Sequence, residues 1–81
     1  MTKVLLFGRL SDIAGWRERS FDRAPATLFA LKALLAQEDG ELGKALDGKG
    51  VSAALDRVLV RGDRPLTHGS EVAFMPPMSG G

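Results

Sequence analysis

The residues best suited to chemistry are the last six, Pro76-Pro77-Met78-Ser79-Gly80-Gly81. Paired prolines favour an extended conformation and cannot donate hydrogen bonds to a sheet. We therefore expect a folded domain over residues 1–75 and a tail over residues 76–81. Six extended residues reach about 20 Å. Because glycine has no Cβ, the two final glycines suit a chain end that passes through a narrow channel into another protein.

The reactive group of such a tail would be the carboxylate of Gly81. A carboxylate is a poor electrophile, and it becomes reactive once an enzyme has converted it to an acyl-adenylate. Attack by an amine then gives an amide, whereas attack by sulfide gives a thiocarboxylate. Short tails of small residues also arise without a function, so the Gly-Gly pair by itself supports only a hypothesis.

Composition narrows the class of protein. The 81 residues are 44% hydrophobic and 26% charged, which is typical of one small globular domain. The net charge of +1 argues against general nucleic-acid binding, and the lack of cysteine excludes disulfides, thiolate catalysis and thiolate metal sites. The apolar run at residues 4–7 is too short for a signal peptide or a membrane span, so we expect a cytoplasmic protein.

The elements that must position the tail follow from apolar spacing. Residues 3–7 and 18–21 read as two strands of a hairpin. Thr27 is a suitable N-cap for a helix from Leu28 to about Glu38, with leucines at helical spacing and Gly40 as the stop.

The second half of the chain predicts one further helical turn and more strands. Residues 41–47 fit the turn, and residues 47–50 fit a loop. Residues 51–55, 57–61 and 71–75 are strand-like. The order predicts an α+β roll in which one main helix packs across a mixed sheet.

Two local patterns fit turns better than sites. Residues 43–49 have the glycine and lysine spacing of a phosphate-binding loop, but Gly50 stands where Ser or Thr should bind magnesium. His68, the only histidine, lies beside Gly69 without a cluster of other ligands. Trp16 follows Gly15 in a predicted loop and is expected to support the edge of the core.

Side-chain alternation predicts a partner-binding face. Val72 and Phe74 should face the helix, which leaves Ala73 and Met75 outside. The same reasoning places Val58 and Val60 inside and puts Phe7, Leu59 and Met75 on the outer face of neighbouring strands. An exposed apolar patch near a reactive tail indicates a protein interface, unless these residues cover a second small core.

Residues 63–81, DRPLTHGSEVAFMPPMSGG, resemble the C-terminal signature of the small subunit of molybdopterin synthase, the MoaD type of ubiquitin-like sulfur carrier. The shared residues are Pro65, Leu66, Gly69, Glu71, Val72, Ala73, Phe74, Pro76, Pro77, Ser79, Gly80 and Gly81. The segment KVLLFGRLSDIAG and the helix also fit that family. The resemblance implies a β-grasp fold.

The resemblance also implies a function without catalysis by the chain alone. An ATP-using enzyme of the ubiquitin-activating type adenylates Gly81, and a sulfurtransferase step converts it to a thiocarboxylate. The tail then enters the synthase large subunit and delivers sulfur to cyclic pyranopterin monophosphate. A heterotetramer of two small and two large subunits is expected, with no permanently bound cofactor and no metal.

The implied site residues follow from this scheme. Gly81 holds the sulfur, and Gly80 passes through the channel. The partner-binding residues are expected to be Phe7, Leu59, Met75, Pro76, Pro77, Met78 and Ser79.

Two alternatives share the Gly-Gly end. A sulfur carrier for thiamin usually lacks the Phe-x-Pro-Pro segment, and a ubiquitin-like modifier would join Gly81 to a lysine. Asp56, Met75 and Met78 depart from residues common in the molybdopterin family. These departures bear on partner affinity rather than on the type of reaction.

Overall fold

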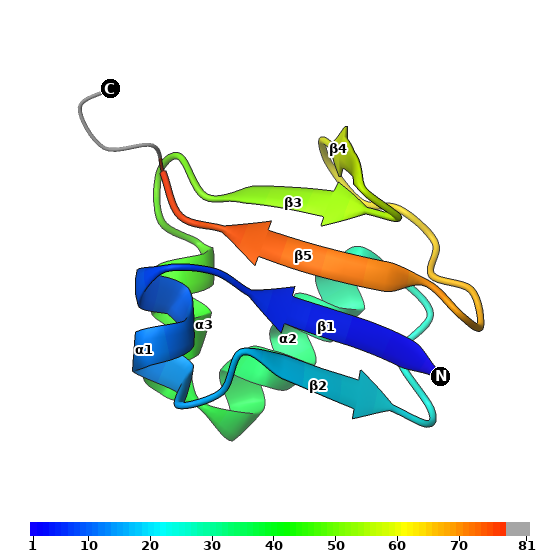
Figure 1. Cartoon of the computed structure of the whole chain (residues 1–81), viewed down its shortest axis with the longest axis horizontal. Coiled ribbons are helices and arrows are strands. Elements are labelled where there is room, and N and C mark those ends of the chain that lie inside the picture. The colour runs from blue at the N-terminus through cyan, green and yellow to red at the C-terminus, as the bar shows by residue number, and fades with distance from the viewer. Residues whose placement is uncertain (78–81) are drawn as a thin grey trace.

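The computed structural model describes residues 1–77 and shows a five-stranded sheet with helices packed on one of its faces (Figure 1). The strands are β1 (Thr2–Leu6), β2 (Glu18–Phe21), β3 (Ser52–Leu55), β4 (Val58–Val60) and β5 (Glu71–Met75). The helices are α1 (Arg9–Ala14), α2 (Leu28–Glu38) and α3 (Gly40–Leu46). The predicted α+β arrangement is confirmed.

The sheet order is β2-β1-β5-β3-β4, and only β1 and β5 are paired in parallel. Parallel strands finish at the same edge of a sheet, so the ends of β1 and β5 lie together. Strand β3 is antiparallel to β5, which brings the start of β3 to that same edge. In Figure 1, α1 and α3 lie at this edge and α2 crosses behind the sheet.

The core lies between the sheet and α2. Val4 pairs with Val72 and Leu6 pairs with Phe74, and all four side chains are buried. The helices contribute Leu10, Leu28, Leu31, Leu35, Leu42 and Leu46 to the same cluster. Trp16 is partly buried against this cluster, as predicted.

Helix α2 has the predicted bounds, and the Thr27 hydroxyl accepts the N–H of Ala30 at 3.2 Å as an N-cap. The prediction that Gly40 ends this helix is wrong, since Gly40 begins α3. Asp39, rather than Gly40, separates the two helices. It ends α2 in an extended conformation, and its carboxylate accepts the N–H groups of Glu41 and Leu42 at 3.1 and 3.2 Å. A second helix can therefore start at once.

Helix α1 was not predicted. It has six residues, buries Leu10 and ends at Gly15, which has a left-handed φ of 81°. Strands β1 and β2 pair antiparallel as expected, but α1 lies in their connection, so they are not a simple hairpin. Six residues are too few for apolar spacing to distinguish a helix from a loop.

The edge strand β4 shows that the prediction of a buried Val58 is wrong. Val60 is partly buried against the core, but Val58 is 64% exposed. Strand β4 pairs only with β3 among the described strands and forms the far edge of the sheet. The register places Val58 and Val60 on the face of Leu55 and Ala53, as predicted, but the core does not extend under Val58.

The remaining signals have structural explanations. Gly43 lies inside α3, where an added Cβ would lie 2.5 Å from the Ala36 Cβ, so this glycine allows α2 and α3 to pack closely. The helix is also the wrong context for a phosphate-binding loop. His68 is exposed, and its ring lies 3.1 Å from the amino nitrogen of Met1.

No helix within residues 1–77 combines the length and the apolar content of a membrane span.

Candidate functional site

The site is organised around the base of the tail. Strand β5 ends at Met75, and Pro76 and Pro77 follow between the end of β1 and the start of β3. The N–H of Phe7 donates to the carbonyl of Phe74 at 3.2 Å on one side, and Met75 pairs with Ser52 on the other. Because proline has no N–H, Pro76 and Pro77 cannot donate backbone hydrogen bonds to the neighbouring strands.

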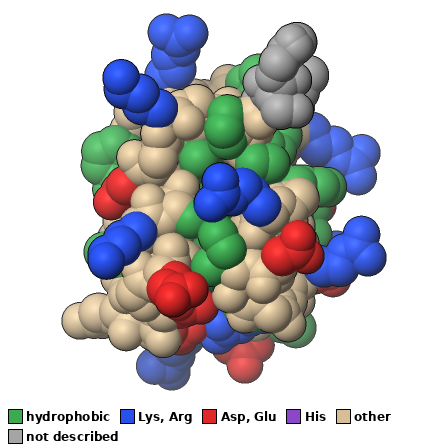
Figure 2. Space-filling view, turned by 90° about the vertical axis from the view of Figure 1, so that its left-hand side faces the viewer, with side chains coloured by type: hydrophobic (Ala, Val, Ile, Leu, Met, Phe, Trp, Pro, Cys, Tyr) green, Lys and Arg blue, Asp and Glu red, His purple; other side chains and the backbone are tan. Residues whose placement is uncertain are grey.

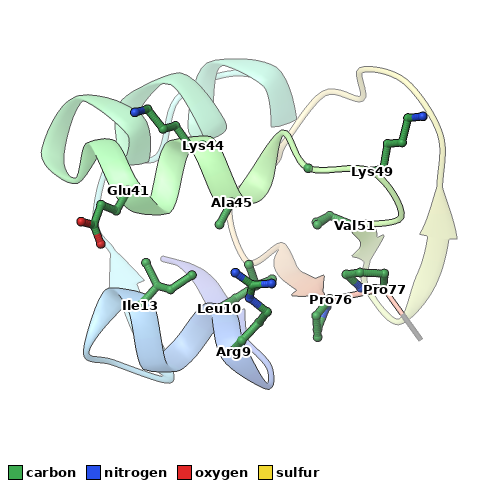
Figure 3. A pocket seen from close by; sticks show the side chains of 11 residues that line it. Arg9, Leu10, Ile13, Glu41, Lys44, Ala45, Lys49, Val51, Pro76 and Pro77 are labelled. Atoms are coloured by element: carbon green, nitrogen blue, oxygen red, sulfur yellow. The ribbon is translucent and has the colours of Figure 1, made fainter. Parts of the chain in front are cut away.

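An open groove of about 590 Å³ lies beside the two prolines, between α1 and α3. Figure 3 shows Pro76 and Pro77 at one end of it, with Arg9 and Leu10 on one side and Val51 on the other. Its lining is mixed, with apolar side chains such as Ile13 and Ala45 beside exposed charged residues. The charged residues are Arg9, Lys44, Lys49 and Glu41.

Figure 2 shows the same side of the molecule as a surface. Hydrophobic side chains extend from the middle of this face toward the end of the described chain, and Lys and Arg side chains stand out around them. The base of the tail is thus bordered by apolar surface with positive charge nearby.

The outer face of the sheet carries the predicted apolar residues. Leu6 and Phe74 are paired and buried, so the following residues, Phe7 and Met75, lie side by side and face outward. Phe7 is 48% exposed and Met75 is partly exposed. The neighbouring placement of Phe7 and Met75 is confirmed.

Leu59 lies farther from this pair than predicted. It is 69% exposed on β4, and β3 separates β4 from β5, so Leu59 and Met75 are not on neighbouring strands. The sheet order, which depends on distant pairings, caused the error. The exposure of Phe7 and Leu59 argues against the alternative that they cover a second core.

One row of paired residues connects the two parts of the face. Leu5 pairs with Ala73, Ala73 with Ala54, and Ala54 with Leu59. Ala54 was missed because its role is visible only from the register. We use the name outer strip for this set: Leu5, Phe7, Ala54, Leu59, Ala73 and Met75.

Charged residues border the outer strip at the end away from the tail. Lys3 pairs with Glu71 across β1 and β5, and Arg57 lies 3.8 Å from the Glu71 carboxylate. An apolar strip with a charged border is the usual build of a protein-binding surface.

The other predicted site residues, Met78, Ser79, Gly80 and Gly81, lie outside the described residues, and their roles stay predictions. Within residues 1–77, no three His, Asp or Glu side chains are grouped as a metal site.

Comparison with known proteins agrees with this picture. The model of the ThiS family matches residues 4–81. The molybdopterin synthase sulfur carrier subunit of Escherichia coli K12 is 36% identical over 81 residues, the whole of both chains. The protein of the same name from Haemophilus influenzae is 28% identical, also over the full length of both.

Solved structures establish the fold. The crystal structure of SAMP1 from Haloferax volcanii matches with a TM-score of 0.82 at 22% identity, covering 99% of this chain and 98% of that one. A second structure, of the H. volcanii small archaeal modifier protein 1, matches with a TM-score of 0.72 over 95% of this chain and 97% of its own. The fold is the β-grasp of ubiquitin-like proteins, as expected.

The match to the family model covers nearly all of the chain, and the E. coli relative aligns from end to end. The chain therefore belongs to the ThiS family, and within it to the MoaD type of molybdopterin synthase small subunits.

Proposed function

We propose that this protein is a sulfur carrier whose Gly81 carboxylate is activated, loaded with sulfur and inserted into a molybdopterin synthase large subunit. The carboxylate attacks the α-phosphorus of ATP on a ubiquitin-activating-type enzyme, which releases pyrophosphate and gives the acyl-adenylate. Sulfide-level sulfur, released from a sulfurtransferase by a thiol reductant, then attacks the acyl carbon and displaces AMP, which gives the thiocarboxylate.

The thiocarboxylate sulfur would bond to a side-chain carbon of cyclic pyranopterin monophosphate and displace an oxygen from it, which joins Gly81 to the pterin as a thioester. Water would then cleave this thioester, which leaves the sulfur on the pterin and restores the Gly81 carboxylate, so the carrier can be loaded again. Because a dithiolene contains two sulfurs, each pterin requires two deliveries.

One observation supports this proposal most strongly: the apolar outer strip, in which Phe7 and Leu59 are exposed, has its Phe7 and Met75 end directly beside the base of the tail. Phe7 and Met75 belong to the strip, and Pro76 and Pro77 follow Met75 at the same edge of the sheet. A partner that covers the strip would receive the tail at the same time. We assign the strip to the large subunit, in an assembly of two small and two large subunits.

The proposal divides the work between two proteins. This chain would supply the sulfur atom and a surface that fixes its position, and the large subunit would supply the catalytic side chains. The tail residues Met78 and Ser79 would lie in the channel of the large subunit, with Gly80 at its narrowest part.

Intact-mass spectrometry tests the loading step. Incubation with the activating enzyme, ATP and a sulfur donor should add about 16 Da, since one sulfur replaces one oxygen. The chain without Gly81 is the control and should gain nothing. Isopeptide adducts on lysines, with no gain of sulfur, would instead favour a protein modifier.

A second experiment separates the synthase from other sulfur pathways. The loaded carrier should convert cyclic pyranopterin monophosphate to molybdopterin when it is mixed with the large subunit. A carrier that becomes loaded but delivers sulfur only to a thiamin precursor would contradict the assignment.

A further inference from the structure

Two glycines contact the two prolines at the base of the tail. A Cβ added at Gly8 would lie 2.9 Å from the Pro76 Cγ, and one added at Gly50 would lie 2.6 Å from the Pro77 Cβ. Both distances are shorter than Cβ atoms show in proteins. A side chain at either position would therefore have to displace a proline ring.

The sheet topology places these glycines on opposite sides of the tail. Gly8 follows β1 and Gly50 precedes β3, and these are the two neighbours of β5 in the sheet. Figure 3 shows the prolines between the segments that contain them, beside Arg9 on one side and Val51 on the other. Successive tail residues are thus contacted from two directions.

Backbone conformation explains why Gly8 and Gly50 are glycines, but it does not explain why both lie against the tail. Gly8 and Gly50 have φ values of +56° and +82°, which favour glycine. Gly15 and Gly69 have similar values, +81° and +91°, yet an added Cβ there would meet nothing within 4 Å. Among the glycines of residues 1–77, only Gly8 and Gly50 approach the prolines of the tail this closely.

We propose that Gly8 and Gly50 form a proline seat, which fixes the direction in which the tail leaves the domain. Proline has a fixed φ and a rigid ring, so contacts to two successive prolines constrain the chain more than contacts to flexible side chains do. The seat positions the tail and takes no part in bond making. Its role in sulfur delivery rests on the proposed function.

The seat predicts an effect on reaction rate that is separate from binding. The outer strip is unchanged in a Gly50→Ala variant, so its affinity for the large subunit should fall much less than its rate of sulfur delivery. Sulfur delivery within the preformed complex should slow by about 10-fold or more, because misplacement of a reacting group by 1 Å can lower a rate by about 100-fold.

Gly15→Ala is a matched control for backbone strain. Gly15 and Gly50 have φ values of +81° and +82°, but only Gly50 lies against a proline. Both variants should lose stability from backbone strain in chemical denaturation, and only Gly50→Ala should slow delivery. Equal slowing by both variants would overturn the proposal.

Rescue provides a second test. The atom that a Cβ added at Gly8 would approach is the Pro76 Cγ, and Pro76→Ala removes it. The double variant Gly8→Ala, Pro76→Ala should deliver sulfur at the rate of Pro76→Ala alone. Gly8→Ala alone should deliver sulfur more slowly than the double variant. Absence of rescue would show that Gly8→Ala acts through backbone strain and not through the seat.

Tail direction can also be measured without any sulfur chemistry. The chain has no cysteine, so spin labels can be placed at Ser79→Cys and at Gln37→Cys on the exposed side of α2. Electron paramagnetic resonance should give a distance distribution that shifts in Gly50→Ala and not in Gly15→Ala. An unshifted distribution in Gly50→Ala would refute the seat.

The two readouts separate the possible failures. A shifted distribution with unchanged delivery would show that the direction of the tail does not matter, which overturns the positioning role. If the original chain is never loaded with sulfur, the proposed function fails, but the distance measurement still tests the seat.

Discussion

The two ends of the central strand pair β1 and β5 are built in opposite ways. Where the strands begin, polar groups bond to one another: the N–H of Asp56 donates to the Glu71 carbonyl at 2.8 Å, and the Asp56 carboxylate accepts the Glu71 N–H at 2.9 Å. Ser70 is buried there, and its hydroxyl accepts the N–H of Thr67 at 3.0 Å.

Where the strands finish, exposed apolar side chains lie beside an open groove that also carries charged residues. Phe7 is 48% exposed beside Met75, and two prolines follow that have no N–H to donate. The comparison indicates that one end holds the sheet together and the other end is available to partners. Variants at the open end should therefore affect reaction and binding, and variants at the closed end should affect stability.

The largest effect should come from removing Gly81. The variant has no glycine carboxylate in the required position, so sulfur transfer should be abolished. Residues 1–77, which contain all the described strands and helices, are unchanged, so the free energy of unfolding should stay the same. Molybdopterin formation with purified partners and chemical denaturation measure the two effects. Activity of the shortened chain would contradict the carrier proposal.

Gly80→Val should have the next largest effect. A β-branched side chain restricts the backbone and widens the chain where a channel must admit it. Adenylation and delivery should both fall by about 100-fold or more if the reacting group is displaced by 1 Å. Binding of the domain to the large subunit should survive. Adenylation kinetics equal to those of the original chain would show that the tail is not tightly enclosed.

Phe7→Ala should weaken binding to the large subunit by about 2 kcal/mol, as truncation of an interface anchor does. Isothermal titration calorimetry with the large subunit measures this. Phe29→Ala is a matched control, because Phe29 is 52% exposed but lies on α2, behind the sheet (Figure 1), whereas Phe7 faces outward from it. Phe29→Ala should leave the affinity unchanged.

The folding stability of the isolated Phe7→Ala protein provides a second test of the interface. Half-exposed Phe7 should contribute much less to folding than a buried phenylalanine, whose removal costs about 3–5 kcal/mol. A strongly destabilised Phe7→Ala monomer with unchanged intrinsic binding would overturn the assignment of the outer strip as an interface.

The smallest effect should come from Asp56→Ala, at the closed end. Asp56 has a φ of 49°, and its carboxylate accepts the Glu71 N–H, so the variant should lose about 1–2 kcal/mol of stability. Affinity for the large subunit should not change. Asp56→Asn keeps an acceptor oxygen and tolerates a left-handed backbone, so it should be close to the original in urea denaturation. A loss of affinity in Asp56→Ala without a loss of stability would contradict the division between the two ends.

The sequence predicted features that depend on local spacing. The leucines of α2 and the alternation of β1 and β5 were sufficient to place the helix and to assign the two faces of the central strands. The outward direction of Phe7 and Met75 followed from the same alternation.

The remaining features depend on long-range pairing. The exposure of Val58 and the separation of Leu59 from Met75 follow from the place of β4 at the sheet edge, which residue patterns do not specify. The contacts of Gly8 and Gly50 with the prolines join segments that are far apart in the sequence. Each of these glycines resembles an ordinary turn residue until the neighbouring strands are known.

The contact between Gly50 and Pro77 also limits the geometry of any partner. With Pro77 held at the domain surface, only the four residues of 78–81 remain to bridge the distance to a reacting group. Four residues span at most about 14 Å. An activating enzyme and a synthase subunit that both use this carrier must therefore place their reacting atoms within the same depth below their docking surfaces, even if the two proteins share no other feature.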